Sequence, residues 1–185
     1  MALPAVKHFS VTDYLAWENE QPTKNEYLNG EVFAMVGATR RHNEIALNVA
    51  TALKIHLDGA RCRPYISDMK LHVRAANAFF YPDVMVTCEE SDHKADLYLE
   101  SPALIVEVLS DSTQGYDRGA KFAAYRTLDS LKEYVLIDPE HRRTEIFRRN
   151  EEGLWVLYEF VGDKPVTIAS VALTIAPEQS FNNVD

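Results

Sequence analysis

The stretch Ala103-Leu104-Ile105-Val106-Glu107-Val108-Leu109-Ser110 decides the fold class. Its apolar residues do not alternate with polar ones, a pattern typical of a strand that is covered on both faces. One residue breaks the run, because Glu107 places a carboxylate at its centre. An isolated ionised carboxylate is costly to bury, so the pattern predicts a cation beside Glu107.

A second short run, Tyr81-Pro82-Asp83-Val84-Met85-Val86, carries one carboxylate in the same way. Asp83 and Glu107 lie on successive strand-like segments, and adjacent strands would bring the two side chains together. Mg²⁺ is usually held by one or two carboxylates together with waters and substrate phosphates. The pair therefore predicts a magnesium site, at which Mn²⁺ can substitute. Such an ion would make water more acidic and neutralise charge on a phosphodiester.

Each carboxylate also has a simpler interpretation. Asp83 can be a turn acid that ends the loop after residues 75–78. Glu107 would then need a dedicated Arg or Lys partner, because a mid-strand carboxylate in an apolar run is costly to leave unpaired.

The rest of the chain predicts a mixed sheet flanked by helices, an α/β (mixed α+β) fold. Asn29-Gly30 supplies the positive φ angles of a two-residue turn, which indicates a hairpin within 26–36. The segment from Leu104 through 117–128 to Val135 has the order strand, helix, strand of a crossover unit. Helices are expected at 10–21, 42–58 and 117–128, and strands at 69–73, 80–86, 103–109, 133–138, 144–149 and 154–161, with one or two edge strands within 166–175.

Length and composition fit one domain over 1–185, with a core at about 9–181. The chain has 185 residues, of which 46% are hydrophobic and 25% charged, as in ordinary globular proteins. Its net charge of -9 argues against a nonspecific polyelectrolyte binder but does not exclude a nuclease. Basic residues gather in the first half of the chain, at Arg40, Arg41, Arg61, Arg63, Lys70 and Arg74. They predict either a local basic face or one of two solvated surfaces of opposite sign.

Cys62 and Cys88 are the only cysteines, and their spacing suggests neither a thiolate zinc site nor a disulfide framework. Buried free thiols are expected. The chain has no run of 18 apolar residues, and residues 1–7 lack a signal-peptide pattern. A soluble cytoplasmic protein with no membrane association is therefore expected.

At its two carboxylates the chain resembles the PD-(D/E)XK nuclease superfamily, since Pro82-Asp83 matches the first element and Glu107-Val108 begins the second. From about Phe9 to Phe181 it resembles more closely the Uma-type restriction-endonuclease family. The resemblance rests on ordered blocks at 26–31, His42-Asn43, 81–84, 102–110, 117–125 and 133–138. It implies a restriction-endonuclease-like core with additional C-terminal antiparallel strands, and Asp83, Glu107 and Val108 as metal ligands.

The chain departs from the superfamily pattern at Leu109, where a lysine is expected. In the Uma-type pattern a lysine on the following helix substitutes, and here that residue is Lys121. It would orient water or stabilise developing negative charge. The alternative is an exposed helical ion pair with Asp117, worth about 0.2–0.5 kcal/mol. Lys70, on the strand before Asp83, is the reserve candidate for the missing lysine.

Three further residues lie in the matching blocks. Glu26 is either a plain hairpin residue or a further acid of the site that holds water. His42 starts a helix and is either a surface residue or a group for proton transfer near neutral pH. Tyr125, one turn beyond Lys121, is expected to pack beside it rather than to react.

These observations predict a divalent-metal-dependent endonuclease that hydrolyses phosphodiester bonds in DNA. Two alternatives remain open: a catalytically inactive scaffold that binds nucleic acid or protein, favoured by Leu109 and the acidic net charge, and a metal-dependent hydrolase with another substrate. By analogy with restriction-type nucleases a homodimer is expected. Trp155, Tyr158 and Phe160 offer a surface for it.

Overall fold

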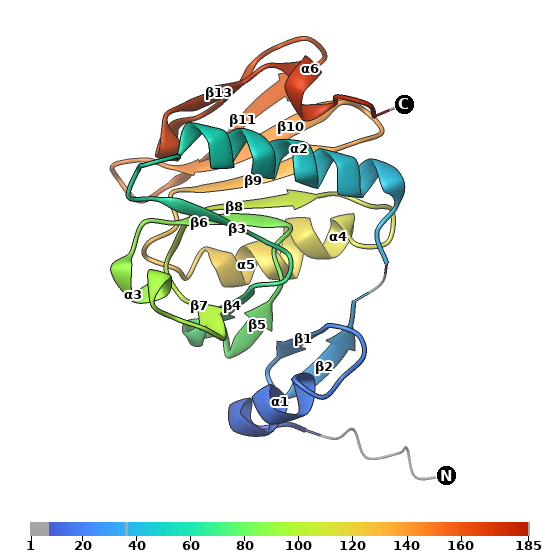
Figure 1. Ribbon diagram of the computed structural model, residues 1–185, viewed down its shortest axis with the longest axis vertical. Coiled ribbons are helices and arrows are strands. Elements are labelled where there is room, and N and C mark those ends of the chain that lie inside the picture. The colour runs from blue at the N-terminus through green and yellow to red at the C-terminus, as the bar shows by residue number, and fades with distance from the viewer. Residues whose placement is uncertain (1–7, 36, 185) are drawn as a thin grey trace.

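The structure is a computed structural model that describes residues 8–35 and 37–184 (Figure 1). The expectations for residues 1–7 and for Val36 at the end of the hairpin lie outside the described residues. Its helices are α1 (Val11–Glu18), α2 (Arg40–His56), α3 (Glu90–His93), α4 (Gln114–Tyr116), α5 (Phe122–Tyr125) and α6 (Pro177–Ser180). Its strands are β1 (Asn25–Leu28), β2 (Glu31–Ala34), β3 (Arg63–Ile66), β4 (Lys70–Val73), β5 (Ala78–Phe80), β6 (Val84–Thr87), β7 (Tyr98–Leu99), β8 (Pro102–Val108), β9 (Glu133–Asp138), β10 (Arg143–Arg149), β11 (Trp155–Val161), β12 (Val166–Ile168) and β13 (Leu173–Ile175).

A six-stranded sheet with the order β11-β10-β9-β8-β6-β3 forms the centre of the molecule. Strand β8 runs parallel to β9 and antiparallel to β6, so the sheet is mixed. The chain reaches β9 from β8 through the helical segment that contains α4 and α5, which confirms the predicted crossover. The α/β fold with a mixed central sheet and C-terminal antiparallel strands is thus confirmed.

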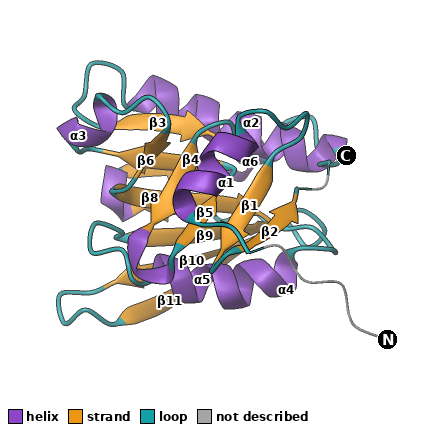
Figure 2. Cartoon of the chain, turned by 90° about the horizontal axis from the view of Figure 1, so that it is seen from below, coloured by secondary structure: helices purple, strands orange, loops and turns teal. Residues whose placement is uncertain are grey.

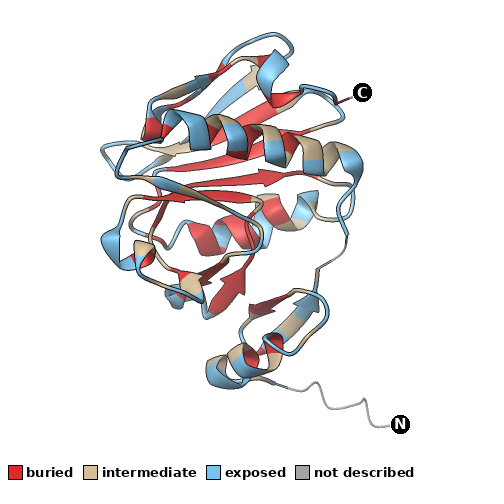
Figure 3. Ribbon diagram, in the orientation of Figure 1, coloured by how far each residue is buried: buried red, intermediate tan, exposed pale blue. Residues whose placement is uncertain are grey.

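Strand β8 is buried along its whole length because helices cover both faces of the sheet. Figure 1 shows α2 on one face and α4 with α5 on the other, and Figure 3 shows the buried strands between them. Leu104 and Val106 pack in the core beneath α2, whereas Ile105 packs with α5. Glu107 follows on the α5 side, so it faces the crossover helix.

A five-stranded sheet with the order β2-β1-β5-β4-β7 lies beside the first, as Figure 2 shows. The single strand expected at 80–86 is wrong. Strand β5 ends at Phe80 in the five-stranded sheet, and β6 begins at Val84 in the six-stranded one. Pro82 lies between them, and a proline lacks the N–H that a sheet ladder needs. Residues 81–83 therefore carry the chain from one sheet to the other.

The N-terminal elements follow their local signals. Ser10 caps α1, and its side chain accepts a hydrogen bond from the Asp13 N–H. Asn29 and Gly30 both have positive φ in the turn between β1 and β2. Strand β3 was not expected, because Pro64 within it weakens the strand pattern.

The helical segment expected at 117–128 runs from Gln114 to Tyr125 and contains a π-turn at Asp117–Lys121. A π-turn adds one residue to a turn of the helix. In a straight α-helix, residues four apart rotate by about 40° relative to each other. The wider turn reduces that drift between Asp117 and Lys121, and both side chains are buried.

The C-terminal strands β9, β10 and β11 pair antiparallel as expected. Strands β12 and β13 form a separate two-stranded sheet rather than edge strands of the main sheet. Strand β11 is an edge strand with several exposed apolar side chains. Of the three aromatic residues predicted for a dimer surface, only Tyr158 is exposed. Phe160 packs partly into the core on the α2 side of the sheet, and Trp155 packs partly into the core on the α5 side.

The expectation of free thiols is wrong, because Cys62 and Cys88 form a disulfide. The antiparallel register that pairs Arg63 with Thr87 brings the two flanking cysteines opposite each other, with Cα atoms 4.0 Å apart. Sequence spacing cannot reveal a pairing that depends on strand register. Disulfides are rare in cytosolic proteins, so this cross-link does not favour the expected cytoplasmic location.

The basic residues of the first half are mostly paired with acids. The ion pairs are Arg40 with Glu44, Arg41 with Glu140, Arg61 with Glu89 and Arg74 with Glu100. Lys70 is buried. These contacts favour individually neutralised side chains over a local basic face.

Within residues 8–35 and 37–184, none of the helices has the length and apolar character needed to cross a membrane.

Candidate active site

Asp83 and Glu107 lie opposite each other where the two sheets meet. The register that pairs Val84 with Val106 continues to Asp83 and Glu107. The Asp83 N–H donates to Oε2 of Glu107 at 3.2 Å, and the Val108 N–H donates to Oδ2 of Asp83 at 2.8 Å. The Asp83 backbone thus holds the Glu107 carboxylate, and the backbone of the residue after Glu107 holds the Asp83 carboxylate.

Glu107 is the more deeply buried of these two acids. Only 3% of its surface is exposed, since it lies between β8 and the helix that follows. Burial, together with the negative charges of Asp83, Asp117 and Glu26, raises the pKa of Glu107 to about 8, although Lys121 opposes this shift. A group with this pKa exchanges a proton near neutral pH or binds a cation that replaces the proton.

Lys121 reaches Glu107 from the crossover helix. Its Nζ lies 3.1 Å from Oε1 of Glu107, 3.0 Å from Oε1 of Glu26 and 3.5 Å from Oδ1 of Asp117. Burial lowers the pKa of Lys121, but the three carboxylates outweigh burial and hold this pKa above its ordinary value. The alternative of an exposed ion pair with Asp117 is wrong, because both side chains are buried.

The five-stranded sheet contributes Glu26, which is buried on β1. Its Oε1 also accepts a hydrogen bond from the Tyr81 N–H at 3.4 Å, directly before Pro82-Asp83. Glu26 is therefore more than a hairpin residue, since it joins Lys121 to the segment that carries Asp83. Asp117 was considered only as a surface partner of Lys121. Its place among the buried acids follows from the tertiary packing, and burial raises its pKa.

His42 lies in the first turn of α2, on the other side of Asp83. Its Nε2 is 3.1 Å from Oδ2 of Asp83, and the imidazole also hydrogen-bonds the Val108 backbone carbonyl. Burial lowers the pKa of His42, but the bonds to Asp83 and Val108 outweigh it and raise this pKa above the ordinary value. His42 is thus no free surface residue, and its ring contacts two of the predicted metal ligands.

Tyr125 packs in the core as expected, and its hydroxyl also donates to Oε1 of Glu107 at 3.0 Å. Lys70 is placed differently from Lys121. Its Nζ lies 5.5 Å from the centre of the Tyr81 ring, and within the described part of the chain no ion pair joins it to Asp83 or Glu107. The geometry therefore brings Lys121, and not Lys70, to Glu107.

The fit of a metal ion depends on the donors that the site presents. Among residues 8–35 and 37–184, no group of three or more His, Cys, Asp or Glu side chains is arranged to hold a metal ion. A magnesium ion needs fewer, because one or two carboxylates with waters suffice. Asp83, Glu107 and the Val108 carbonyl supply oxygen atoms only, the donors that this ion prefers. Nε2 of His42 already lies 3.1 Å from Oδ2 of Asp83, so this carboxylate has room for a partner on that side.

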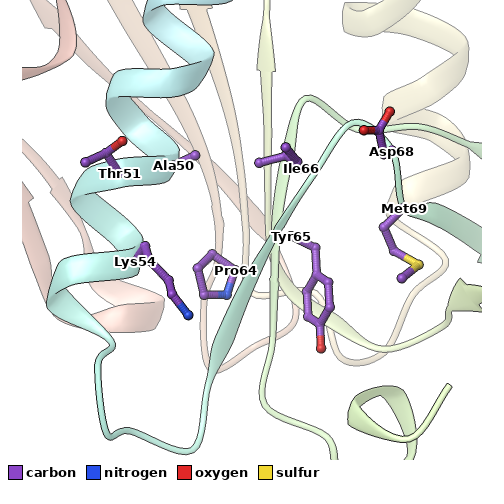
Figure 4. A pocket seen from close by; sticks show the side chains of 8 residues that line it. All are labelled: Ala50, Thr51, Lys54, Pro64, Tyr65, Ile66, Asp68 and Met69. Atoms are coloured by element: carbon purple, nitrogen blue, oxygen red, sulfur yellow. The ribbon is translucent and has the colours of Figure 1, made fainter. Parts of the chain in front are cut away.

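One pocket lies away from these residues. It has a volume of about 520 Å³, lies between α2 and β3, and includes none of the predicted site residues among those drawn in Figure 4. A smaller cavity of about 130 Å³ lies by the ends of β8 and β9 and is lined by Leu109, Ser110 and Asp138 among others. This cavity is lined by the residue that follows Val108, but neither Asp83 nor Glu107 lines it.

A mixed sheet with an Asp–Glu pair on adjacent strands and a buried lysine on the crossover helix defines a restriction-endonuclease-like fold. Residues 11–178 match the family described as "Uma2: Putative restriction endonuclease". The chain belongs to this family. Two uncharacterized proteins of Synechocystis sp. are similar to it. One is 34% identical over 175 residues, which cover 95% of this chain and 92% of the relative. The other is 33% identical over 165 residues, which cover 88% and 93%.

A solved structure has the same fold. It is described as a "putative nuclease belonging to DUF820" from Anabaena variabilis, and the superposition has a TM-score of 0.78. The match covers 96% of this chain and 99% of the other, at 18% sequence identity. The similarity extends over nearly the whole length of both chains, which agrees with the family assignment.

Proposed function

We propose that this protein is a divalent-metal-dependent endonuclease that hydrolyses phosphodiester bonds in DNA. The observation that carries the proposal is the convergence of Asp83, Glu107 and Lys121 at the junction of the two sheets. Membership of a family of nuclease type supports the reaction class. Water is the nucleophile in this proposal.

The acids and the lysine have separate roles. Asp83, Glu107 and the Val108 carbonyl would hold Mg²⁺, or Mn²⁺ in its place. When bound, this ion would supply positive charge that neutralises the phosphodiester and makes water more acidic. Lys121 would stabilise negative charge that develops on the phosphate, and its ammonium is kept charged by the acids around it.

Two other residues would manage water and protons. Glu26 lies 3.0 Å from Lys121 and would orient both this ammonium and an attacking water. His42 contacts Asp83, and its pKa is raised from a value near neutrality, so its ring would carry a proton to or from the reacting groups.

The second candidate is a scaffold that binds nucleic acid or protein without cleaving it. The pairing of most basic residues in the first half with acids favours a scaffold that binds protein, because affinity for a phosphate backbone depends on available Lys and Arg side chains. The replacement of the superfamily lysine by Leu109 points the same way.

Plasmid nicking with Mg²⁺ or Mn²⁺ tests the two candidates. Purified protein is expected to nick supercoiled DNA, and Asp83→Asn and Glu107→Gln are each expected to reduce the rate by at least about 100-fold, as for the loss of a group that stabilises a transition state. Glu133→Gln is the matched control, because Glu133 is a buried acid of the same sheet that pairs with Arg148 instead.

The results separate the candidates. Nicking that survives both site variants would show that another site, or a contaminant, cleaves the DNA. Binding of DNA without cleavage, with an affinity that falls steeply with salt, would instead favour the scaffold.

A further inference from the structure

The two oxygens of Glu107 have different partners. Oε1 accepts from Lys121 at 3.1 Å and from the Tyr125 hydroxyl at 3.0 Å, whereas Oε2 accepts from the Asp83 N–H at 3.2 Å. The side chain is therefore held in one orientation, with Oε2 on the side of Asp83. A metal ion shared by the two acids would approach this oxygen.

Lys121 alone does not fix the position of Oε1 of Glu107. Its ammonium is shared among three carboxylates at similar distances, those of Glu26, Glu107 and Asp117. In the proposed reaction it must also turn toward a phosphate. Each movement of Lys121 toward the substrate would weaken its hold on Glu107.

Tyr125 has no such competing task. Its side chain is fully buried, with its ring in edge-to-face contact with Phe80 and Tyr134 at centroid distances of 5.3 and 5.4 Å. Its hydroxyl donates to Oε1 of Glu107 at 3.0 Å. Its position is fixed by packing on both sides.

We infer that Tyr125 is a positioning residue, which holds the Glu107 carboxylate with Oε2 toward Asp83 while Lys121 engages the substrate. This inference rests on the proposed function and assigns to Tyr125 a role that packing alone does not require. Outer partners that orient ligating carboxylates commonly change metal affinity by 10- to 100-fold when they are removed.

The test compares Tyr125→Phe with Tyr14→Phe in the full chain. Both tyrosines are fully buried, and Tyr14 donates its hydroxyl to the Asn25 carbonyl in another part of the core. Each variant keeps its ring and loses one buried hydrogen bond, so the two are expected to fold with similar losses of thermal stability. Mn²⁺ binding is then titrated calorimetrically, and plasmid nicking is measured over a range of Mn²⁺ concentrations.

Tyr125→Phe is expected to weaken Mn²⁺ binding about tenfold, and Tyr14→Phe to leave it unchanged. Nicking by Tyr125→Phe is expected to recover when the Mn²⁺ concentration is raised, which a merely structural defect would not do. Equal Mn²⁺ affinity in wild type and Tyr125→Phe would overturn the inference and leave the proposed function intact. A wild-type protein that binds no Mn²⁺ would overturn both.

Discussion

The Nζ atom of Lys121 lies 3.1 Å from Oε1 of Glu107, although one residue comes from a helix and the other from a strand. The contact places a lysine beside the second acid of the pair without placing it two residues later on the same strand. The strand position is occupied by Leu109, which packs in the core instead. The lysine beside Glu107 thus comes from the helical segment that follows β8 and not from the strand itself.

Lys121→Met is expected to lower both stability and cleavage. The substitution leaves the buried carboxylates of Glu26, Glu107 and Asp117 without their shared cation, and removal of one partner from a buried ion pair costs about 3–5 kcal/mol. Urea unfolding would measure the loss. Adding Glu107→Gln should recover part of the stability but none of the cleavage. Cleavage by the single variant Lys121→Met at the wild-type rate would show that Lys121 has no role in the reaction.

The stability of the metal-free protein is expected to fall as the pH rises from about 4.5 to about 8. Burial raises the folded-state pKa of Glu107 to about 8 from an ordinary value of 4.5, so folding takes up a proton in this window. The stabilising contribution is complete below the lower value and is lost as the pH rises through the higher one.

Unfolding in the presence of a chelator would measure this dependence, with a slope of up to about 1.4 kcal/mol per pH unit from Glu107. His42 has a raised pKa and contributes a slope of the same sign. Lys121 also has a raised pKa, but its contribution is lost only above the ordinary lysine value, outside the window. The comparison with Glu107→Gln isolates the acid, and identical slopes in the two proteins would contradict the assignment.

Cleavage of the disulfide is expected to destabilise the fold without changing the site. Cys62 and Cys88 are 26 residues apart, and a cross-link that closes a loop of this size contributes about 3.5 kcal/mol. The thermal midpoint of the double variant Cys62→Ser/Cys88→Ser should therefore be lower than that of the wild type, while its Mn²⁺ affinity stays the same. If the thermal midpoint of the double variant equals that of the wild type under both reducing and oxidising conditions, the disulfide does not form in solution.

Strand β11 is expected to pair with the same strand of a second copy. It is an edge strand whose apolar side chains Leu157 and Tyr158 are 50% and 40% exposed, and unprotected edges of this kind favour pairing with another chain. Sedimentation would detect a dimer. Leu157→Lys should make the protein monomeric, whereas Leu47→Lys, at a more exposed position on α2, should not. A wild-type monomer at high concentration would rule the pairing out.

Local sequence patterns predicted most of the elements that surround the site. The continuous apolar run around Val106 indicated a strand covered on both faces, and β8 is covered by α2 on one face and by the crossover helix on the other. The Asn29-Gly30 turn and the Ser10 cap were readable because each depends on the conformation of only a few neighbouring residues. The expected strand at 80–86 failed because β-propensity on either side of Pro82 does not report which sheet a segment joins.

The sequence by itself determined the two acids and the strand that carries Glu107, because an acid within an apolar run is costly to bury. Only the tertiary structure decided which groups compensate for the cost of burying these acids. Glu26, His42 and the pair of Lys121 and Tyr125 come from three separate segments, and the contacts within the site depend on how two sheets and two helices pack. The pairing of Cys62 with Cys88 was hidden for the same reason, since strand register is set by contacts distant in sequence.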